Sequence, residues 1–374
     1  MFPAGAALLC RRLLNELNPS YILIAGENFL KAVRIHEHGG VEKLRYEDAP
    51  EPTIANPTDA IIKLSAASLN HIDIWNRRGL PGMKIAFPRI LGGDGAGVVT
   101  DVGSRVNNIK IGGAVCLYPP SGCGRCEFCA TDREYLCVHL RVLGERDDGT
   151  YAEYVRAPAR NCFPIPSGMS FEEAAAFPLV YLTVWRMLQT NAALKPGEHV
   201  LILGIGGGVA SAALQLAASI GARIIVTSSS DDKLEKAKSL GADDGINYTK
   251  ADFAQEVRRL TGKRGVDVVV DCVGGDSWVK SLASLAKDGR LVTCGATAGA
   301  TPATDIQRIF WNHLKIFGST LGSRTEFKAV LNFIAATRTR PVIDQVFPLA
   351  EAAPAQKRME EGKQFGKIVL RIDR

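Results

Sequence analysis

HVLILGIGGGVA, residues 199–210, is the most informative segment of this 374-residue chain. Its apolar run 199–203 has the length and composition of a buried strand, and a glycine turn separates it from a helix expected over 209–220. In such a unit, glycine lets the backbone come close to a pyrophosphate, whose charge the helix N-terminus stabilises. The register Gly204-x-Gly206 leaves a valine where a third glycine would stand. We favour the shifted register, which keeps the small Ala210 there and predicts three cofactor contacts: Gly207, Gly208 and Val209.

Strand-like and helical segments alternate after this turn. Residues 223–227, 266–271 and 289–294 are apolar runs, and a helix is expected over 232–240. Continuous apolar strands that alternate with helices are typical of a parallel sheet covered on both faces. The sequence therefore predicts an α/β fold with a doubly wound parallel sheet.

The preceding part of the chain has a different pattern. Short strand-like segments, such as 60–64, 96–100 and 114–118, are broken by glycine and proline. This pattern predicts a largely antiparallel β domain, with a small barrel as the expected architecture. A helix is expected over 170–188, with a capping box formed by Ser170 and Glu173.

The first 30 residues are expected to lie outside the fold, because a natural first strand begins near Lys31. Arg11 and Arg12 follow a short apolar piece, whereas a secretory signal places charge before its apolar run. An upstream start codon and a targeting segment both remain open as the origin of this extension.

Four of the nine cysteines fall within 15 residues, with the spacing C-x2-C-x2-C-x7-C: Cys123, Cys126, Cys129 and Cys137. Zn²⁺ takes four thiolates in a closed tetrahedron that leaves no position for substrate. We therefore predict one structural zinc per chain in the loop 121–139. An iron–sulfur cluster and four unrelated cysteines are the alternatives. The isolated cysteines indicate buried thiols in a reducing compartment, so we expect a cytoplasmic protein.

Composition argues against several classes of function. Hydrophobic residues make up 46% of the chain and charged residues 22%, as in globular proteins. No stretch approaches the roughly 18 to 20 apolar residues of a membrane span. The net charge of +6 comes from interspersed basic and acidic residues without a basic run, so neither nucleic acid nor a membrane is expected as a partner. A modestly basic surface suits an anionic cofactor or a small anionic substrate.

The end of the second strand of the parallel sheet distinguishes the two nicotinamide dinucleotides. An acidic residue there would bind the ribose 2′-hydroxyl and repel a 2′-phosphate. This sequence has Ser228 at that point, followed by other serines and by Lys233, which favours NADP(H). Asp231 and Asp232 lie close by, and they keep NAD(H) open as the alternative.

The cysteine loop, the segment GGDGAGVV at 92–99 and the glycine turn together resemble the medium-chain dehydrogenase/reductase superfamily, which includes zinc alcohol dehydrogenases and quinone and enoyl reductases. The resemblance extends from about residue 31 to residue 371. It implies a GroES-like β-barrel catalytic domain over 31–178, a Rossmann domain over 179–318 and a return to the catalytic domain over 319–374. The active site would lie in the cleft between the two domains.

The residues that depart from this family suggest the type of reaction. Where zinc alcohol dehydrogenases have the cysteine, histidine and later cysteine or aspartate that hold a catalytic metal, this chain has Asn70, Gly93 and approximately Leu179. An enzyme without that Lewis acid does not readily polarise an alcohol oxygen. The resemblance is therefore to the metal-independent branch, which moves hydride from NADPH to a quinone or an α,β-unsaturated carbonyl.

In this branch, Asn70 is our candidate for the hydrogen bond to the substrate oxygen, and Asp73 is expected to orient its loop. The resemblance further implies four cofactor-contacting residues outside the glycine turn: His71, Thr183, Tyr248 and Lys367. Two alternatives to this reading are an alcohol dehydrogenase with a remodelled metal site and a non-enzymatic NADPH-binding protein. No residue is identified as the proton donor.

Residues 316–322, close to Phe310 and Trp311, are expected to form the last strand of the parallel sheet. A bare edge strand with apolar side chains invites aggregation, and pairing with its twin across a two-fold axis would satisfy it. We therefore expect a homodimer or a homotetramer.

Overall fold

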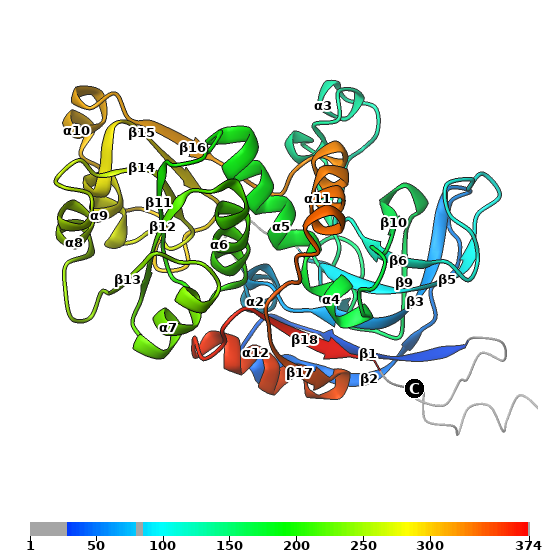
Figure 1. The fold of residues 1–374 in the computed structure, drawn as a ribbon. Helices are drawn as coiled ribbons and strands as arrows, with labels where there is room; N and C mark the ends of the chain where they lie inside the picture. Colours follow the sequence, from blue (N-terminus) through cyan, green and yellow to red (C-terminus); the bar gives the residue numbers. More distant parts are fainter. Residues whose placement is uncertain (1–27, 80–84, 373–374) are drawn as a thin grey trace, which may run out of the picture.

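The computed structural model describes residues 28–79 and 85–372, which form two regions built around two large sheets (Figure 1). The predicted fold class is confirmed: one sheet is parallel and belongs to an α/β layer, and the other is largely antiparallel. The first strand begins at Phe29, two residues before the expected start at Lys31. The expectation for residues 1–27 lies outside the described residues.

The antiparallel region contains a seven-stranded sheet with the order β10-β6-β5-β3-β18-β17, in which β9 also pairs with β3. Smaller sheets of order β2-β1-β4 and β7-β8 flank it. The strands are β1 (Phe29–Ile35), β2 (Arg45–Pro50), β3 (Asp59–Ser68), β4 (Arg89–Ile90), β5 (Asp94–Val102), β6 (Ala114–Leu117), β7 (Pro120–Ser121), β8 (Arg141–Val142), β9 (Tyr154–Pro158), β10 (Cys162–Pro164), β17 (Ile343–Pro348) and β18 (Lys367–Arg371). The last two strands come from the far end of the chain, so the chain returns to the sheet that it started.

The α/β region has a six-stranded parallel sheet with the order β13-β12-β11-β14-β15-β16. This is the order in which a dinucleotide binds at the carboxyl ends of the strands, where the direction of winding reverses. The strands are β11 (His199–Ile202), β12 (Arg223–Ser228), β13 (Asp244–Asn247), β14 (Val266–Asp271), β15 (Leu285–Thr293) and β16 (Lys315–Gly318). The helices between them are α6 (Gly208–Ile220), α7 (Asp231–Ser239), α8 (Phe253–Leu260), α9 (Ser277–Ser284) and α10 (Ile306–Trp311).

Helices cover both faces of the parallel sheet, whose central strand β11 is apolar from Val200 to Ile202. Val200 and Ile202 of β11 pack in one core cluster with residues of α6 and α7. Leu201, between them in sequence, packs in another cluster with residues of α8 and α9. Successive side chains of a strand point to opposite faces, so the unbroken apolar run of residues 200–203 requires helices on both sides, as Figure 1 shows.

The segment that joins the two regions differs from the single helix expected over 170–188. The capping box is confirmed, because the backbone N–H of Glu173 donates to Ser170 Oγ over 3.2 Å and that of Ser170 to the Glu173 carboxylate over 2.9 Å. The helix α4 (Phe171–Ala176) ends, however, and α5 (Pro178–Trp185) begins at a proline. Proline lacks the N–H that would continue the first helix but is well suited to the first turn of the next.

The remaining helices lie against the antiparallel region or connect it to the cysteine loop. They are α2 (His71–Arg78), α3 (Glu127–Ala130), α11 (Arg324–Thr337), α12 (Ala352–Glu360), a π-helical turn at Arg186–Asn191 and short 3-10 turns at Val41–Lys43, Glu134–Leu136, Ala159–Asn161 and Leu349–Glu351. The expected last strand of the sheet is confirmed as the edge strand β16, but Phe310 and Trp311 belong to the preceding helix α10. Within the described ranges, no helix is long and apolar enough to cross a membrane.

Candidate functional site

The glycine turn lies at the carboxyl end of β11, at the centre of the parallel sheet. Gly204 and Gly206 have φ angles of 66° and 121°, which only glycine adopts readily. Gly207 is the N-cap of α6 and Gly208 its first residue, so the helix begins one residue earlier than expected and Val209 lies in its first turn. A Cβ on Gly208 would stand 2.8 Å from Lys367 Cδ, so glycine lets the helix approach β18 closely.

The ribose end of the site is formed by the end of β12 and the start of α7. Ser228 is buried, and its hydroxyl accepts a hydrogen bond from the N–H of Ser230 over 3.1 Å. Lys233 Nζ extends toward the glycine turn and donates to the carbonyl of Gly362 over 2.6 Å. Burial lowers the pKa of the Lys233 ammonium. Tyr248 directly follows β13 and is half-exposed. Its backbone N–H donates to the carbonyl of Ser228 over 3.0 Å.

The carboxylate of Asp231 has partners at this same end of the sheet. It accepts hydrogen bonds from Asn247 Nδ2 over 2.8 Å and from Lys250 Nζ over 2.5 Å. These two residues belong to β13 and the turn after it. The negative charge next to the ribose position is therefore engaged with a lysine and an amide of the neighbouring strand.

Asn70, Asp94 and Lys367 form a buried cluster where α2, β5 and β18 meet. Lys367 Nζ lies 2.6 Å from Asn70 Oδ1, 2.7 Å from the carbonyl of Leu69 and 3.2 Å from Asp94 Oδ2. Asn70 Nδ2 donates to the same Asp94 oxygen over 2.8 Å. Burial lowers the pKa of the Lys367 ammonium, and the adjacent Asp94 carboxylate opposes this shift.

Asp94 is a carboxylate with no exposed surface and a full set of donors. Its Oδ1 accepts from the N–H of Leu179 over 2.9 Å, and its Oδ2 is approached by Ser68 Oγ at 3.4 Å as well as by Asn70 and Lys367. A buried charge that is paired and hydrogen-bonded can be accommodated in this way. These bonds connect the strand β5 to the start of α5.

The donor set at this point does not fit a catalytic zinc ion. The three positions that hold the metal in zinc alcohol dehydrogenases are Asn70, Gly93 and approximately Leu179, of which two have no ligand atom in their side chains. The carboxylate nearest to them, on Asp94, is already paired with the Lys367 ammonium, whose positive charge would repel a dication. Zinc sites need three or four protein ligands of nitrogen, sulfur or oxygen, and this cluster does not supply them.

Asp73 is fully buried in the first turn of α2 and caps that helix. Its Oδ2 accepts from the N–H of Asn70 over 2.8 Å and from the hydroxyl of Tyr151 over 2.9 Å. Its Oδ1 has no hydrogen-bond partner in the described structure. Burial raises the pKa of the Asp73 carboxyl to about 6, against the lowering effect of those bonds.

His71 and Thr183, two of the expected cofactor contacts, lie on α2 and α5, the two helices that contribute contacts to this cluster. His71 is the partly buried first residue of α2, and burial together with the Lys367 charge lowers its pKa. Thr183 is buried on α5, where its hydroxyl donates to the carbonyl of Leu179 over 2.8 Å. The ring of Trp75 on α2 comes close to Gly295, beyond the end of β15. Residues of both regions thus meet at the carboxyl edge of the parallel sheet.

The four cysteines of the loop come together as the spacing predicts. The sulfur atoms of Cys123, Cys126, Cys129 and Cys137 all lie within 4.8 Å of one another. They are the only group of three or more Cys, His, Asp or Glu residues so arranged in residues 28–79 and 85–372. Backbone N–H groups of Arg125 and Cys126 lower the pKa of Cys123 to about 6, and the thiolate form is the one that binds metal. A thiolate set of this geometry fits Zn²⁺.

The cysteine loop is fastened to the rest of the molecule by ionic contacts. The buried Glu134 pairs with Arg324 at 3.2 Å, and the N–H of Thr325 donates to Asp132 over 3.1 Å. The guanidinium of Arg186 stacks 3.8 Å from the ring centre of Tyr135. These contacts join the loop to the first turn of α11 and to the end of α5. The loop is distant in sequence from Asn70.

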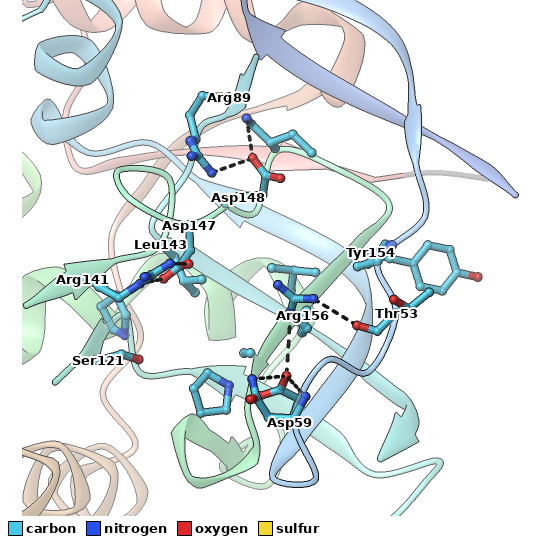
Figure 2. Close-up of a pocket in the computed structure, with 18 of the residues that line it drawn as sticks. Thr53, Asp59, Arg89, Ser121, Arg141, Leu143, Asp147, Asp148, Tyr154 and Arg156 are labelled. Atoms are coloured by element: carbon cyan, nitrogen blue, oxygen red, sulfur yellow. Dashed lines mark hydrogen bonds and ion pairs between the residues drawn. The ribbon is translucent and has the colours of Figure 1, made fainter. Parts of the chain in front are cut away.

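A hollow of about 600 Å³ lies away from the Asn70 cluster (Figure 2). It lies on the antiparallel region between β9, the β7–β8 pair and the segment 50–59. Its arginines face aspartates: Arg89 pairs with Asp148, Arg141 with Asp147 and Arg156 with Asp59. Because these charges neutralise one another and none of the expected site residues lines the hollow, we place the functional site at the Asn70 cluster instead.

Sequence reasoning named Asn70 and Lys367 separately but missed that Asp94 joins them. Asn70 and Lys367 are 297 residues apart, and Asp94 lies on a third element. A buried lysine on the last strand was the available signal, since an apolar strand rarely contains a charge without a partner.

Comparison with known proteins agrees with this architecture. Residues 56–167 match the model of the alcohol dehydrogenase GroES-like domain, and residues 208–336 match that of the zinc-binding dehydrogenase family. A zinc-type alcohol dehydrogenase-like protein of Schizosaccharomyces pombe is 35% identical over 356 residues, covering 92% of this chain and 99% of the relative. An NAD-dependent alcohol dehydrogenase of Sulfurisphaera tokodaii is 31% identical, covering 91% and 99%.

Two solved structures illustrate the range of similar folds. The crystal structure of an NAD-dependent alcohol dehydrogenase is 42% identical, with a TM-score of 0.88 over 92% of this chain and all of the other. A crotonyl-CoA carboxylase/reductase is 26% identical, with a TM-score of 0.85 over 92% of this chain and 88% of the other.

Proposed function

We propose, for a chain that belongs to the zinc-type medium-chain dehydrogenase/reductase superfamily, that it is an oxidoreductase which reduces quinones or α,β-unsaturated carbonyl compounds with NADPH, without a catalytic zinc ion. The family and the type of enzyme, an alcohol dehydrogenase-like oxidoreductase, are the premise. The proposal concerns the substrate class, the cofactor and the metal.

The observation that carries the proposal is the replacement of a metal site by an amide, a carboxylate and an ammonium. Lys367 lies 3.2 Å from Asp94 and 2.6 Å from Asn70, where a dication would have to bind. Hydride addition to a conjugated carbonyl or a quinone makes the substrate oxygen negative, and a hydrogen-bond donor can stabilise that charge. Such a substrate therefore depends less on a Lewis acid than an alcohol does. The similarity to a crotonyl-CoA carboxylase/reductase supports a substrate with a conjugated double bond.

The ribose pocket supports NADPH over NADH. Ser228, at the end of β12, offers a hydroxyl at the position where an acidic side chain would exclude a phosphate. Lys233 lies in the first turn of α7 and offers a positive charge near that position. Asp231 is neutralised by Lys250, as described above. Two relatives are named for NAD, so the proposed preference for the phosphorylated cofactor rests on the residues of this pocket alone.

The residues of the site have separate roles in the proposed reaction. The turn at Gly207 and Gly208 would hold the pyrophosphate at the N-terminus of α6, and the nicotinamide, when bound, supplies the hydride. Asn70 would donate its amide N–H to the substrate oxygen. His71, whose pKa is lowered, would be neutral at pH 7 and would act as a hydrogen-bonding contact for the cofactor rather than as a charge. Asp73 holds the first turn of α2, and with it Asn70, in place.

We further propose that the zinc ion held by the four cysteines is structural. The four sulfur atoms lie within 4.8 Å of one another, and four thiolates would fill the tetrahedral coordination of Zn²⁺, so no coordination position would remain for a substrate. Through its contacts with Arg324, Thr325 and Arg186, the zinc-bound loop would anchor α11 and α5.

We propose a homodimer, with a homotetramer as its extension. The edge strand β16 and the neighbouring α10 expose large apolar side chains: Ile306, Phe310, Trp311 and Ile316. Trp311 is 72% exposed. A second copy paired along the edge strand would cover these side chains and its free backbone groups.

The experiment that tests the proposed activity is NADPH oxidation against a panel of quinones, enones and simple alcohols or ketones, with the products identified. Reduction of the C=C bond or of the quinone, with no oxidation of alcohols, is expected. Turnover of alcohols with NAD would favour the alcohol dehydrogenase reading that the names of the relatives suggest. Tight NADPH binding without turnover on the whole panel would favour a non-enzymatic binding protein.

A further inference from the structure

The ammonium of Lys367 has no hydrogen left for a cofactor or a substrate. A lysine ammonium has three N–H groups. Here they are used by the carbonyl of Leu69, Oδ1 of Asn70 and Oδ2 of Asp94. The residue is 3% exposed and its Cδ packs beside Gly208. These contacts direct the charge of Lys367 toward Asn70 and Asp94.

The same contacts determine which way the amide of Asn70 faces. Its oxygen must face the ammonium, because the reverse orientation would bring an NH₂ group against a cation and an oxygen against a carboxylate. Its nitrogen then donates one N–H to Asp94 over 2.8 Å. No second acceptor for Asn70 Nδ2 lies within hydrogen-bonding distance among the residues that the structure describes. One N–H of the amide is therefore available to a ligand.

Residue 93, the neighbour of Asp94 in the chain, is a glycine at a position that could accept a side chain. A Cβ built on Gly93 would have only ordinary contacts, 3.6 Å from the Leu143 carbonyl and 3.6 Å from Leu179 Cδ1. Gly92, in contrast, has a φ of 101° and a Cβ there would collide with Tyr151. The backbone therefore requires glycine at 92 but not at 93.

We propose that Lys367 is a positioning residue for the reaction, which holds and polarises the amide of Asn70 so that the free N–H of the amide meets the reacting oxygen of the substrate. The inference rests on the proposed function, which supplies that oxygen. A donor at one end of an amide strengthens the donor at its other end, since hydrogen bonds in a chain polarise one another. Lys367 does not touch the substrate itself, so its effect passes through Asn70.

This assignment differs in a measurable way from the cofactor contact that the family resemblance implies for Lys367. In a Lys367→Met variant, kcat for the enone or quinone should fall about 100-fold, the cost of losing one aligned donor at a developing oxyanion. The dissociation constant for NADPH, measured by fluorescence without substrate, should change less than about threefold, a small shift on the scale where tenfold is 1.4 kcal/mol. A rise of tenfold or more with kcat retained would assign Lys367 to the cofactor and overturn the proposal.

A double-variant cycle separates positioning from a general structural effect. If Lys367 acts through Asn70, the Lys367→Met/Asn70→Ala pair should be no slower than Asn70→Ala alone, because coupled residues are not additive. Multiplied losses would contradict the inference. Lys367→Gln, which keeps a donor without the charge, should recover part of the rate and covers the case in which methionine prevents folding. Lys328→Met, an exposed lysine on α11, is the matched control and should match the wild type.

The proposed function and this inference can fail separately. Wild-type turnover on the substrate panel decides the proposed function. The NADPH dissociation constant of Lys367→Met can be measured even if no compound on the panel is reduced. An unchanged constant excludes a direct contact of Lys367 with the cofactor, and a weakened one overturns the proposal.

Discussion

Replacing Asp73 with asparagine should alter how stability depends on pH. The Asp73 carboxyl has no exposed surface, and its Oδ1 is without a partner in the described structure. Burial raises its pKa from 3.8 to about 6. A carboxyl whose pKa is higher in the folded state favours folding when it is protonated, and its ionisation above that range destabilises the fold.

The magnitude follows from the size of the shift. One pKa unit corresponds to about 1.4 kcal/mol, so a rise of roughly two units costs about 3 kcal/mol at pH 7 relative to a group with the same pKa folded and unfolded. The loss begins as pH rises above the unfolded value near 4 and is complete above the folded value near 6. Between pH 4.5 and 7.5 the wild type should lose about 2 kcal/mol relative to Asp73→Asn.

Denaturant unfolding of both proteins across this pH range, with zinc present throughout, gives the difference directly. Asparagine keeps an oxygen for the N–H of Asn70 but cannot ionise, so the pH-independent cost of the substitution cancels when the difference is plotted against pH. Asp101→Asn, at an exposed carboxylate of β5, controls for the loss of a negative charge as such. Parallel curves for wild type and Asp73→Asn, or a difference that grows in the opposite direction, would refute the reasoning.

Three other predictions follow from the site and the surface. Cys126→Ser should release zinc and lower the melting temperature while activity per folded molecule survives, as metal analysis and assays on the folded fraction would show; loss of activity in a folded protein would make the zinc more than structural. Ser228→Asp should shift the preference from NADPH toward NADH, because a carboxylate binds the 2′-hydroxyl and repels the phosphate; an unchanged ratio of kcat/KM values would show that the ribose pocket is misplaced. Trp311→Glu should convert a dimer to monomers in light scattering, whereas Tyr46→Glu on β2, a similarly exposed aromatic of the antiparallel region, should not; a monomeric wild type at micromolar concentration would overturn the dimer.

The parallel sheet and the cysteine cluster could be predicted from the sequence because their signals are local. The run 200–203 is apolar at every position, as expected for a strand covered on both faces, and the four cysteines lie on one loop whose spacing brings their sulfur atoms together. The strand β13 was missed because its sequence, Asp-Gly-Ile-Asn, has one buried apolar residue, Ile246, and is specified by pairing with β12 rather than by its own pattern.

The helix expected over 170–188 shows the limit of a periodic pattern. Its apolar residues continue through Pro178, so periodicity alone gives one helix, but the missing N–H of proline divides it into α4 and α5. The junction matters for the site, because the N–H of Leu179, in the first turn of α5, donates to Asp94.

The cluster at the centre of the site could not be assembled from the sequence. The family resemblance implies different roles for Asn70 and Lys367. Nothing in their positions in the sequence indicates that the ammonium of Lys367 donates to the amide of Asn70. Only the return of the chain as β18, next to β3, brings the lysine under the amide.

The zinc content of the active enzyme tests the central claim most directly. Metal analysis should be made on the same sample that oxidises NADPH with a quinone or an enone, with protein concentration measured independently. One zinc per chain is predicted, held by the four cysteines, together with full activity. Two zinc ions per chain in that sample would contradict the claim that the reaction proceeds without a catalytic metal.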